Sequence, residues 1–335
     1  MQKFGASQTC NEILKLMKKN IYIYSPSSAV HDKKGFERGI KRLETLGYDV
    51  EIDAAALATF QRFAGDDDTR LAAIHRAAAS GADVALISRG GYGLTRILPG
   101  INYKIVAKAI SKGTQFVGLS DFTAFQMAVM AQTGAVTWAG PALIDDFGVK
   151  NSVDEIMQAC FNDLMTGQGE GSGWRLPKKA INSTATTVDI KSTNANTADN
   201  EITNALLWGG NLSMLASLVG TPYLPLVKNG ILFIEDIGEH PYRVERMLAQ
   251  LLQAGILAQQ KAIIFGQFSK YKLATHDKGF KLASVVKWLQ EKLTVPIFTG
   301  LPFGHVATKV LLPVGQRVTL IVEGRDALLL WRHQH

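Results

Sequence analysis

Short apolar runs alternate with amphipathic stretches through the first 140 residues of this chain. The runs are rich in β-branched and aromatic residues, as strands are, and the stretches between them have the spacing of helices that bury one face. Regular alternation of this kind predicts βαβ units around a mainly parallel sheet. The predicted strands are residues 21–25, 49–52, 84–88 and 115–119, and the predicted helices are residues 34–46, 69–79, 103–112 and 121–132.

The pattern changes in the middle of the chain, where residues 183–204 hold almost no large apolar side chains. Such a stretch cannot bury enough surface to form a core, and it indicates a connection between domains. Beyond it, we predict strands at residues 232–235, 262–266, 295–298, 317–322 and 327–331, with helices at 242–254 and 279–292.

The length of 335 residues also favours two domains over one. We therefore predict an α/β fold in three parts. Residues 1–165 form an N-terminal domain with a mainly parallel sheet flanked by helices. Residues 166–205 form a polar linker, and residues 206–335 form a second, smaller mixed α/β domain.

Polar turns follow three of the predicted N-terminal strands, at residues 25–28, 89–93 and 120–121. Ligands of a parallel sheet bind beyond the carboxyl ends of its strands. We therefore expect the three turns to meet at one crevice.

Ser120 stands where an apolar run ends and helical periodicity begins. A serine at such a corner lies beside the N–H groups of a helix N-terminus, which is how α/β enzymes present a nucleophile. The alternative is that Ser120 simply caps the helix, which is a common role. Phe122 replaces the second glycine of the Gly-x-Ser-x-Gly elbow, so the usual α/β-hydrolase motif is incomplete.

In the second half of the chain, Glu235 ends an apolar, strand-like run, and His305 comes just after another such run. His305 lies in a loop shaped by glycine and proline, where an imidazole can be aimed at a ligand. Glu235 is placed to accept the imidazole N–H and to hold the ring. Together with Ser120 they form a candidate Ser-Glu-His triad. Asp236 and Glu239 remain alternative acids, although helix capping explains at least one of them, and His31 is the second choice of histidine.

The segment from Arg89 to Gly93 has paired glycines, which let a backbone approach a ligand closely and point its N–H groups inward. It lacks the sequence of a P-loop and of a dinucleotide-binding turn. We expect the N–H groups of Gly91 and Asp121 to form an oxyanion hole, Gly90 to contact substrate, and Arg89 to hold a substrate carboxylate or to form a structural ion pair.

The composition, with 47% hydrophobic and 19% charged residues, is that of an ordinary globular protein. The net charge of +7 comes from scattered basic residues without interleaved aromatic ones, so we predict no nucleic-acid partner. No stretch reaches the length of a membrane span, and the first apolar run is too short and too late for a signal peptide. We expect a cytoplasmic protein with no membrane partner. The two cysteines have no metal-ligand spacing, and we predict neither metal nor organic cofactor.

Eight segments together resemble the LD-carboxypeptidases, a family of serine peptidases that includes muramoyl-tetrapeptide carboxypeptidase and the microcin C immunity hydrolase. They occur in the family's order from about residue 20 to about residue 325, which covers nearly the whole chain. The segments are residues 25–28, 63–70, 88–93, 118–121, 140–141, 208–212, 233–236 and 303–305.

The resemblance implies that Ser120 is the nucleophile, His305 the general base and then acid, and Glu235 the orienting carboxylate. It also implies a homodimer and removal of the terminal D-alanine from murein tetrapeptides, by cleavage of an L,D bond, during cell-wall recycling. Trp138, where a Tyr or His is expected before the turn at residues 140–141, indicates altered substrate contacts.

Two other functions remain open at this point. One is the immunity-type hydrolase, which cleaves an amide between a peptide and a nucleotide-like group. A purine needs an aromatic platform, so an exposed Trp174 or Trp208 would favour it, and we take Trp208 as a candidate substrate-binding residue. The other is a non-catalytic α/β protein that binds a small ligand.

Overall fold

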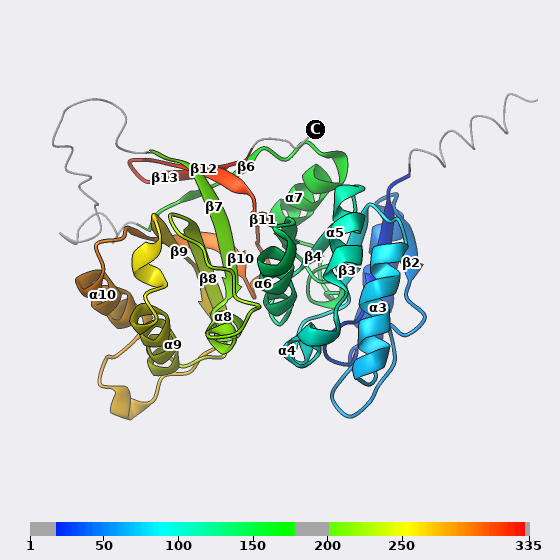
Figure 1. Ribbon diagram of the computed structural model, residues 1–335, viewed down its shortest axis with the longest axis horizontal. Helices are drawn as coiled ribbons and strands as arrows, with labels where there is room; N and C mark the ends of the chain where they lie inside the picture. Colours follow the sequence, from blue (N-terminus) through cyan, green and yellow to red (C-terminus); the bar gives the residue numbers. More distant parts are fainter. Residues whose placement is uncertain (1–17, 178–200, 332–335) are drawn as a thin grey trace, which may run out of the picture.

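Two sheets organise the fold, one in each half of the chain (Figure 1). The computed structural model describes residues 18–177 and 201–331. The first sheet has the strand order β11-β5-β4-β3-β1-β2, and all its neighbours are parallel except β11, which runs antiparallel to β5. Its strands are β1 (Asn20–Tyr24), β2 (Asp49–Ile52), β3 (Val84–Ile87), β4 (Gln115–Gly118), β5 (Thr137–Ala139) and β11 (Leu312–Val314).

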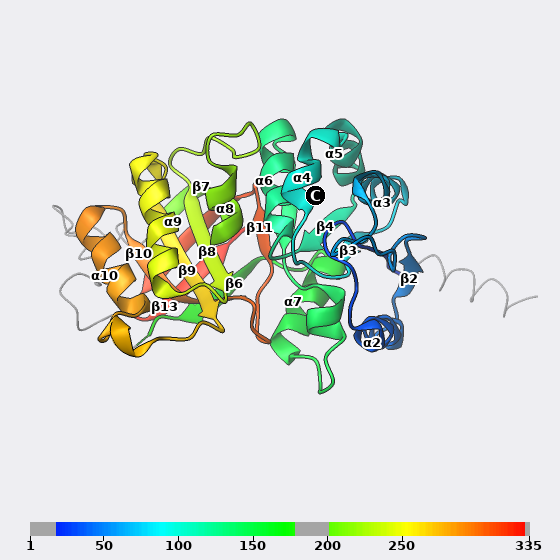
Figure 2. The same ribbon diagram turned by 90° about the horizontal axis from the view of Figure 1, so that it is seen from below.

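Helices cover both faces of this sheet, so that the first half has three layers (Figure 2). Helices α2 (Lys33–Thr45) and α7 (Glu155–Thr166) bury Phe36 and Phe161 against one face. Helices α3 (Asp67–Ala79), α5 (Tyr103–Ser111) and α6 (Phe122–Thr133) cover the other face. The remaining helical elements of this half are α4 (Leu94–Ile97), η1 (Leu98–Gly100) and the π-helical turn η2 (Leu143–Phe147).

The central strand β3 is buried along its whole length, which explains its continuous apolar sequence. Helix α6 is buried from Phe122 to Met130 because it lies between the first sheet and two elements of the second half, β7 (Glu201–Asn211) and α8 (Leu212–Leu218). It ends at Gly134, whose φ of 70° is a left-handed conformation that glycine adopts without strain. The helix that follows Ser120 is thus held on all sides.

The second sheet is mixed, with the order β10-β9-β8-β7-β12-β13-β6. Strands β7 to β10 are parallel, and β12, β13 and β6 are added antiparallel at one side. Its strands are β6 (Gly171–Arg175), β7 (Glu201–Asn211), β8 (Ile231–Ile237), β9 (Ala262–Ser269), β10 (Ile297–Gly304), β12 (Arg317–Glu323) and β13 (Asp326–Leu330). Its helices are α8 (Leu212–Leu218), α9 (Pro241–Gln253), η4 (Leu257–Gln259), η5 (Thr275–Asp277) and α10 (Leu282–Lys292).

The predicted fold class is confirmed, and the predicted N-terminal strands and helices agree with the structure to within about two residues at each end. The boundaries between the parts differ. Residues 171–175, which we placed in a polar linker, form β6, because alternate side chains including Trp174 are buried beneath it. Strand β11 comes from the C-terminal part yet completes the N-terminal sheet. Residues 201–205, also placed in the linker, begin β7, and residues 178–200 lie outside the described residues.

Candidate active site

Ser120 forms the corner between β4 and α6 in a strained backbone conformation. Its φ of 66° lies in the left-handed region, which costs a residue other than glycine about 1–3 kcal/mol. Strain of this kind accompanies a serine nucleophile presented at a strand–helix turn. Within the described chain, the Ser120 hydroxyl accepts no hydrogen bond from an α6 N–H, and Asp121 occupies the N-cap position. The capping interpretation of Ser120 is therefore not supported.

Gly90 lies directly against Ser120. A Cβ atom on Gly90 would come within 2.7 Å of the Ser120 Cβ and 3.0 Å of its Oγ. Only glycine lets the two turns approach this closely, so the contact explains the residue type at position 90.

The three polar turns that follow β1, β3 and β4 contact one another. The Ser28 hydroxyl accepts a hydrogen bond from the Tyr92 N–H at 2.9 Å. The carboxylate of Asp121 accepts from the Leu94 N–H at 2.9 Å and from the Ser27 hydroxyl. Burial raises the pKa of the Asp121 carboxyl, and these donors offset only part of that rise. The predicted convergence of the turns is confirmed.

Gly91 also depends on its small size. It has a φ of 110°, and a Cβ atom there would come within 2.2 Å of the Ser28 Oγ. Gly91 lines the same cavity as Ser120. The two N–H groups that we expect to receive an oxyanion, those of Gly91 and Asp121, thus belong to turns that meet at Ser120.

Glu235 and His305 form a hydrogen bond, with 2.8 Å between the Glu235 Oε2 and the His305 Nδ1. Glu235 is fully buried near the end of β8, and His305 follows β10. Gly304 permits the contact, because its φ is 138° and a Cβ atom there would lie 3.1 Å from the Glu235 Oε2. No described residue forms a hydrogen bond with the other ring nitrogen, Nε2, which is therefore available for a proton transfer.

Asn211, at the end of β7, holds the other oxygen of Glu235. Its Nδ2 lies 3.2 Å from the Glu235 Oε1 and 3.0 Å from the Asp236 Oδ1. Asp236 also accepts hydrogen bonds from the N–H and hydroxyl of Ser213 at the start of α8. Our sequence reasoning did not assign Asn211 to the site, although the Gly-Gly-Asn sequence at the end of a strand was a usable signal.

The other two acids beside Glu235 serve local structure. Asp236 binds the first turn of α8 rather than the helix near Tyr242, and Glu239 lies 3.6 Å from Arg243 on α9. Neither carboxylate contacts His305 in the part of the chain that the structure describes.

The environment of His305 raises its pKa. Burial alone would lower the pKa, but the hydrogen bond and negative charge of Glu235 outweigh that effect. A raised pKa means that the imidazole of the folded protein keeps its proton up to a higher pH than an ordinary histidine does.

We therefore expect kcat/KM for hydrolysis to rise with pH through a midpoint above the ordinary histidine value of about 6.5. The neutral ring is the base, so activity is lost as pH falls through that midpoint. A pH profile of kcat/KM measures it. A midpoint below 6.5 would contradict this account of the Glu235–His305 pair.

Ser120 and His305 line one cavity of about 530 Å³. Three basic side chains, Arg89, Lys270 and Lys309, line it as well. Arg89 donates one hydrogen bond to the Ala29 carbonyl at 3.1 Å, which leaves its other N–H groups for a ligand. Gly90 and Gly91 complete the wall beside Ser120, so the cavity brings together most of the predicted site residues.

Lys309 joins the two halves of the chain beside this cavity. Its Nζ lies 2.5 Å from the Asp146 Oδ1 in the π-helical turn η2, and both side chains are almost fully buried. Thr308 donates a second bond across the halves, to the Asp154 Oδ2 at 2.6 Å. These two contacts hold the loop after His305 against the domain that carries Ser120.

Lys309→Met is expected to destabilise the protein by about 3–5 kcal/mol, because it leaves a buried carboxylate without its partner. The double variant Asp146→Asn/Lys309→Met removes both charges and should recover most of the loss. Denaturant unfolding of the two variants and the wild type measures both effects. Equal stability of the single and double variants would contradict an energetic coupling between Lys309 and Asp146.

The prediction that Trp208 binds substrate is wrong. Its side chain is 1% exposed, and its Nε1 donates to the Gln260 Oε1 at 2.9 Å. Trp174 is buried as well. Trp138, which we expected to alter substrate contacts, does not line the cavity of Ser120 but a separate one.

No group of three or more His, Cys, Asp or Glu side chains in residues 18–177 and 201–331 is placed to hold a metal ion. No helix in the same ranges is both long and apolar enough to cross a bilayer.

Comparison with known proteins gives matches along most of the chain. The sequence profile of the LD-carboxypeptidase N-terminal domain matches residues 21–140, and that of the LD-carboxypeptidase C-terminal domain matches residues 204–320. The chain is 28% identical to the probable murein peptide carboxypeptidase of Bacillus subtilis, over 92% of this chain and 90% of the relative.

Two further proteins similar to this chain have named functions. The crystal structure of muramoyltetrapeptide carboxypeptidase from Oxalobacter formigenes is 36% identical, with a TM-score of 0.79, over 95% of this chain and all of that one. The microcin C7 self-immunity protein MccF of Escherichia coli is 25% identical over 71% of this chain and 70% of the relative.

Proposed function

The chain belongs to the LD-carboxypeptidase family, and from this premise we propose that it removes the terminal D-alanine of murein tetrapeptides by cleaving the L,D bond. The observation that carries the proposal is the 2.8 Å bond between Glu235 and His305 at a cavity that Ser120 also lines. An acid, an imidazole and a strained serine at one cavity are the parts of a serine peptidase.

The proposed reaction proceeds by acyl transfer. Ser120 attacks the scissile carbonyl while His305 takes its proton, and the N–H groups of Gly91 and Asp121 receive the oxyanion. His305 then protonates the departing D-alanine amine, and water resolves the acyl-enzyme with His305 again as base. Glu235 keeps the imidazole in the required tautomer throughout, and Asn211 keeps Glu235 in place.

A carboxypeptidase must bind the terminal carboxylate of its substrate, and Lys270 is the best-placed group for it. Lys270 is exposed at the cavity, and no carboxylate among the described residues forms an ion pair with it. Lys309 is already neutralised by Asp146. Arg89 has N–H groups to spare and is the second candidate.

Lys270→Met is expected to raise KM for the tetrapeptide by about 10- to 100-fold, the value of a charge-assisted hydrogen bond, with a smaller effect on kcat. Lys287→Met on α10, another exposed lysine, is the matched control and should leave both constants unchanged. A KM that stays at the wild-type value in Lys270→Met would assign the carboxylate to another residue.

The test of the proposal itself is release of D-alanine from a synthetic murein tetrapeptide. The same peptide ending in L-alanine should be cleaved far more slowly. A serine-directed phosphonate should label Ser120 and abolish the activity. Absence of labelling, together with no hydrolysis of either peptide, would favour the non-catalytic binding protein.

The immunity-type alternative has less support. It calls for an aromatic platform for a purine, and both Trp174 and Trp208 are buried. We also propose, from the family resemblance, a cytoplasmic homodimer that acts in cell-wall recycling. Sedimentation velocity tests the dimer.

A further inference from the structure

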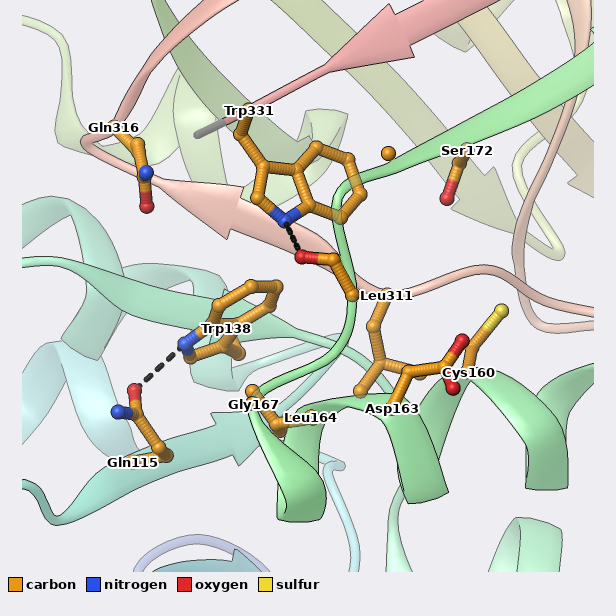
Figure 3. Close-up of a pocket in the computed structure, with 12 residues that line it drawn as sticks. Gln115, Trp138, Cys160, Asp163, Leu164, Gly167, Ser172, Leu311, Gln316 and Trp331 are labelled. Carbon is orange, nitrogen blue, oxygen red and sulfur yellow. Dashed lines mark hydrogen bonds between the residues drawn. The ribbon is translucent and has the colours of Figure 1, made fainter. Parts of the chain in front are cut away.

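A second cavity, of about 120 Å³, lies where the two halves of the chain meet (Figure 3). Trp138 of β5 and Trp331, which follows β13, stand on its wall. Cys160 and Asp163 enter it from α7, and Ser172 enters from β6. This cavity shares no lining residue with the one at Ser120 and His305, so it is a separate site.

The two indole rings form an edge-to-face pair, with 5.9 Å between centroids and 73° between planes. The protein already uses both indole N–H groups. Trp138 donates to the Gln115 Oε1 at 2.7 Å, and Trp331 donates to the Gly169 carbonyl at 3.0 Å. What the rings offer a ligand is therefore their carbon surface and π-electrons, rather than hydrogen bonds.

The described lining of this cavity carries one charged group. It includes the carboxylate of Asp163, and within residues 18–177 and 201–331 it includes no Lys, Arg or His, although the chain as a whole carries a net charge of +7. Among the described residues, no donor or cation is paired with the Asp163 carboxylate. Burial raises the pKa of the Cys160 thiol, so this side chain is an uncharged part of the wall.

We propose that this cavity binds a small organic cation, such as an alkyl- or trimethylammonium group, against the indole surfaces that line it and beside Asp163. Aromatic faces attract such cations through the ring quadrupole, and a nearby carboxylate supplies the countercharge. The volume limits the ligand to one compact group, because it is somewhat below the roughly 150 Å³ of an apolar protein cavity that holds one benzene.

The cavity walls come from both halves of the chain. Gln115, Trp138 and α7 belong to the first half, whereas Ser172 and Trp331 belong to the second. A cation bound there contacts both halves and binds only the folded protein. Its binding is therefore expected to raise the melting temperature in proportion to the logarithm of its concentration.

The test compares choline with 3,3-dimethyl-1-butanol, an uncharged molecule of nearly the same shape, by calorimetric titration of the full chain. We expect choline to bind at least about tenfold more tightly, since a desolvated cation–π contact and a carboxylate both favour the charge. Equal binding of the two molecules, or binding of neither, would overturn the proposal.

Variants locate the binding. Asp163→Asn should weaken the binding of choline by about tenfold and leave the binding of the alcohol unchanged. Glu291 is an exposed acid on α10, and Glu291→Gln should change neither affinity. Trp138→Phe should weaken the binding of choline, while the circular dichroism spectrum of the variant should match that of the wild type. Choline binding that survives Asp163→Asn in full would place the cation elsewhere and refute the site. Peptide hydrolysis by Asp163→Asn should be normal, which separates this proposal from that for Ser120.

Discussion

Ser120→Ala is expected to lower kcat for peptide hydrolysis by a factor on the order of 10⁶, the loss seen when a serine peptidase loses its nucleophile. The fold should survive, because the Ser120 hydroxyl caps no helix N–H in the described part of the chain. A hydrolysis assay with the tetrapeptide and a denaturant unfolding curve measure the two effects separately.

Ser120→Gly is the matched control for backbone strain. Glycine adopts the observed φ of 66° without the cost that alanine or serine bears there, about 1–3 kcal/mol. The glycine variant should therefore be inactive yet at least as stable as the alanine variant. If either variant hydrolyses the tetrapeptide at more than a small fraction of the wild-type rate, Ser120 is not the nucleophile.

The sequence was most informative where a feature depends on neighbouring residues. The alternation of apolar runs and helical stretches gave the order of strands and helices, because both periodicities are local. The corner at Ser120 was visible for the same reason, since an apolar run ends there and a helical one begins. The position of Glu235 near the end of a buried strand also distinguished it from Asp236 and Glu239, whose side chains bind other partners.

The contacts that join distant segments were not predictable in the same way. Lys309 and Asp146 are 163 residues apart, and no local pattern relates them. Strand β11 has three residues and completes a sheet formed by residues from the other end of the chain. Such pairings depend on how the two halves pack together, which a single sequence does not specify.

The error at Trp208 has a related cause. The apolar run around Trp208 predicts a strand, but the sequence does not show which face of that strand is buried and which is exposed. That depends on the layers that cover the sheet. In the structure its indole is buried and pairs with Gln260, 52 residues away. A tryptophan in an apolar run is thus a weak indicator of a binding surface, whereas Trp138, on a short strand at the junction of the halves, lines a cavity.

Glu235→Gln is expected to lower kcat by about 10⁴, as the equivalent change does in a serine protease. The structure supplies the reason. Glu235 accepts from His305 through Oε2 and from the Asn211 amide through Oε1, so it needs an acceptor at both positions. Glutamine has one acceptor oxygen and one NH₂ group. If the NH₂ faces His305, the ring takes the wrong tautomer, and if it faces Asn211, two donors oppose each other inside the protein.

Glu239→Gln is the matched control for this change, because it makes the same substitution four residues along the chain. Glu239 pairs with Arg243 at 3.6 Å at the start of a helix, and solvent screens such an exposed ion pair so that it contributes little to stability. Its kcat should equal that of the wild type. The pH midpoint of any residual activity in Glu235→Gln should fall, since the charge that raises the pKa of His305 is gone while its burial remains. If instead Glu239→Gln is crippled and Glu235→Gln is normal, the 2.8 Å bond to His305 does not serve catalysis, and the acid of the triad is a different residue.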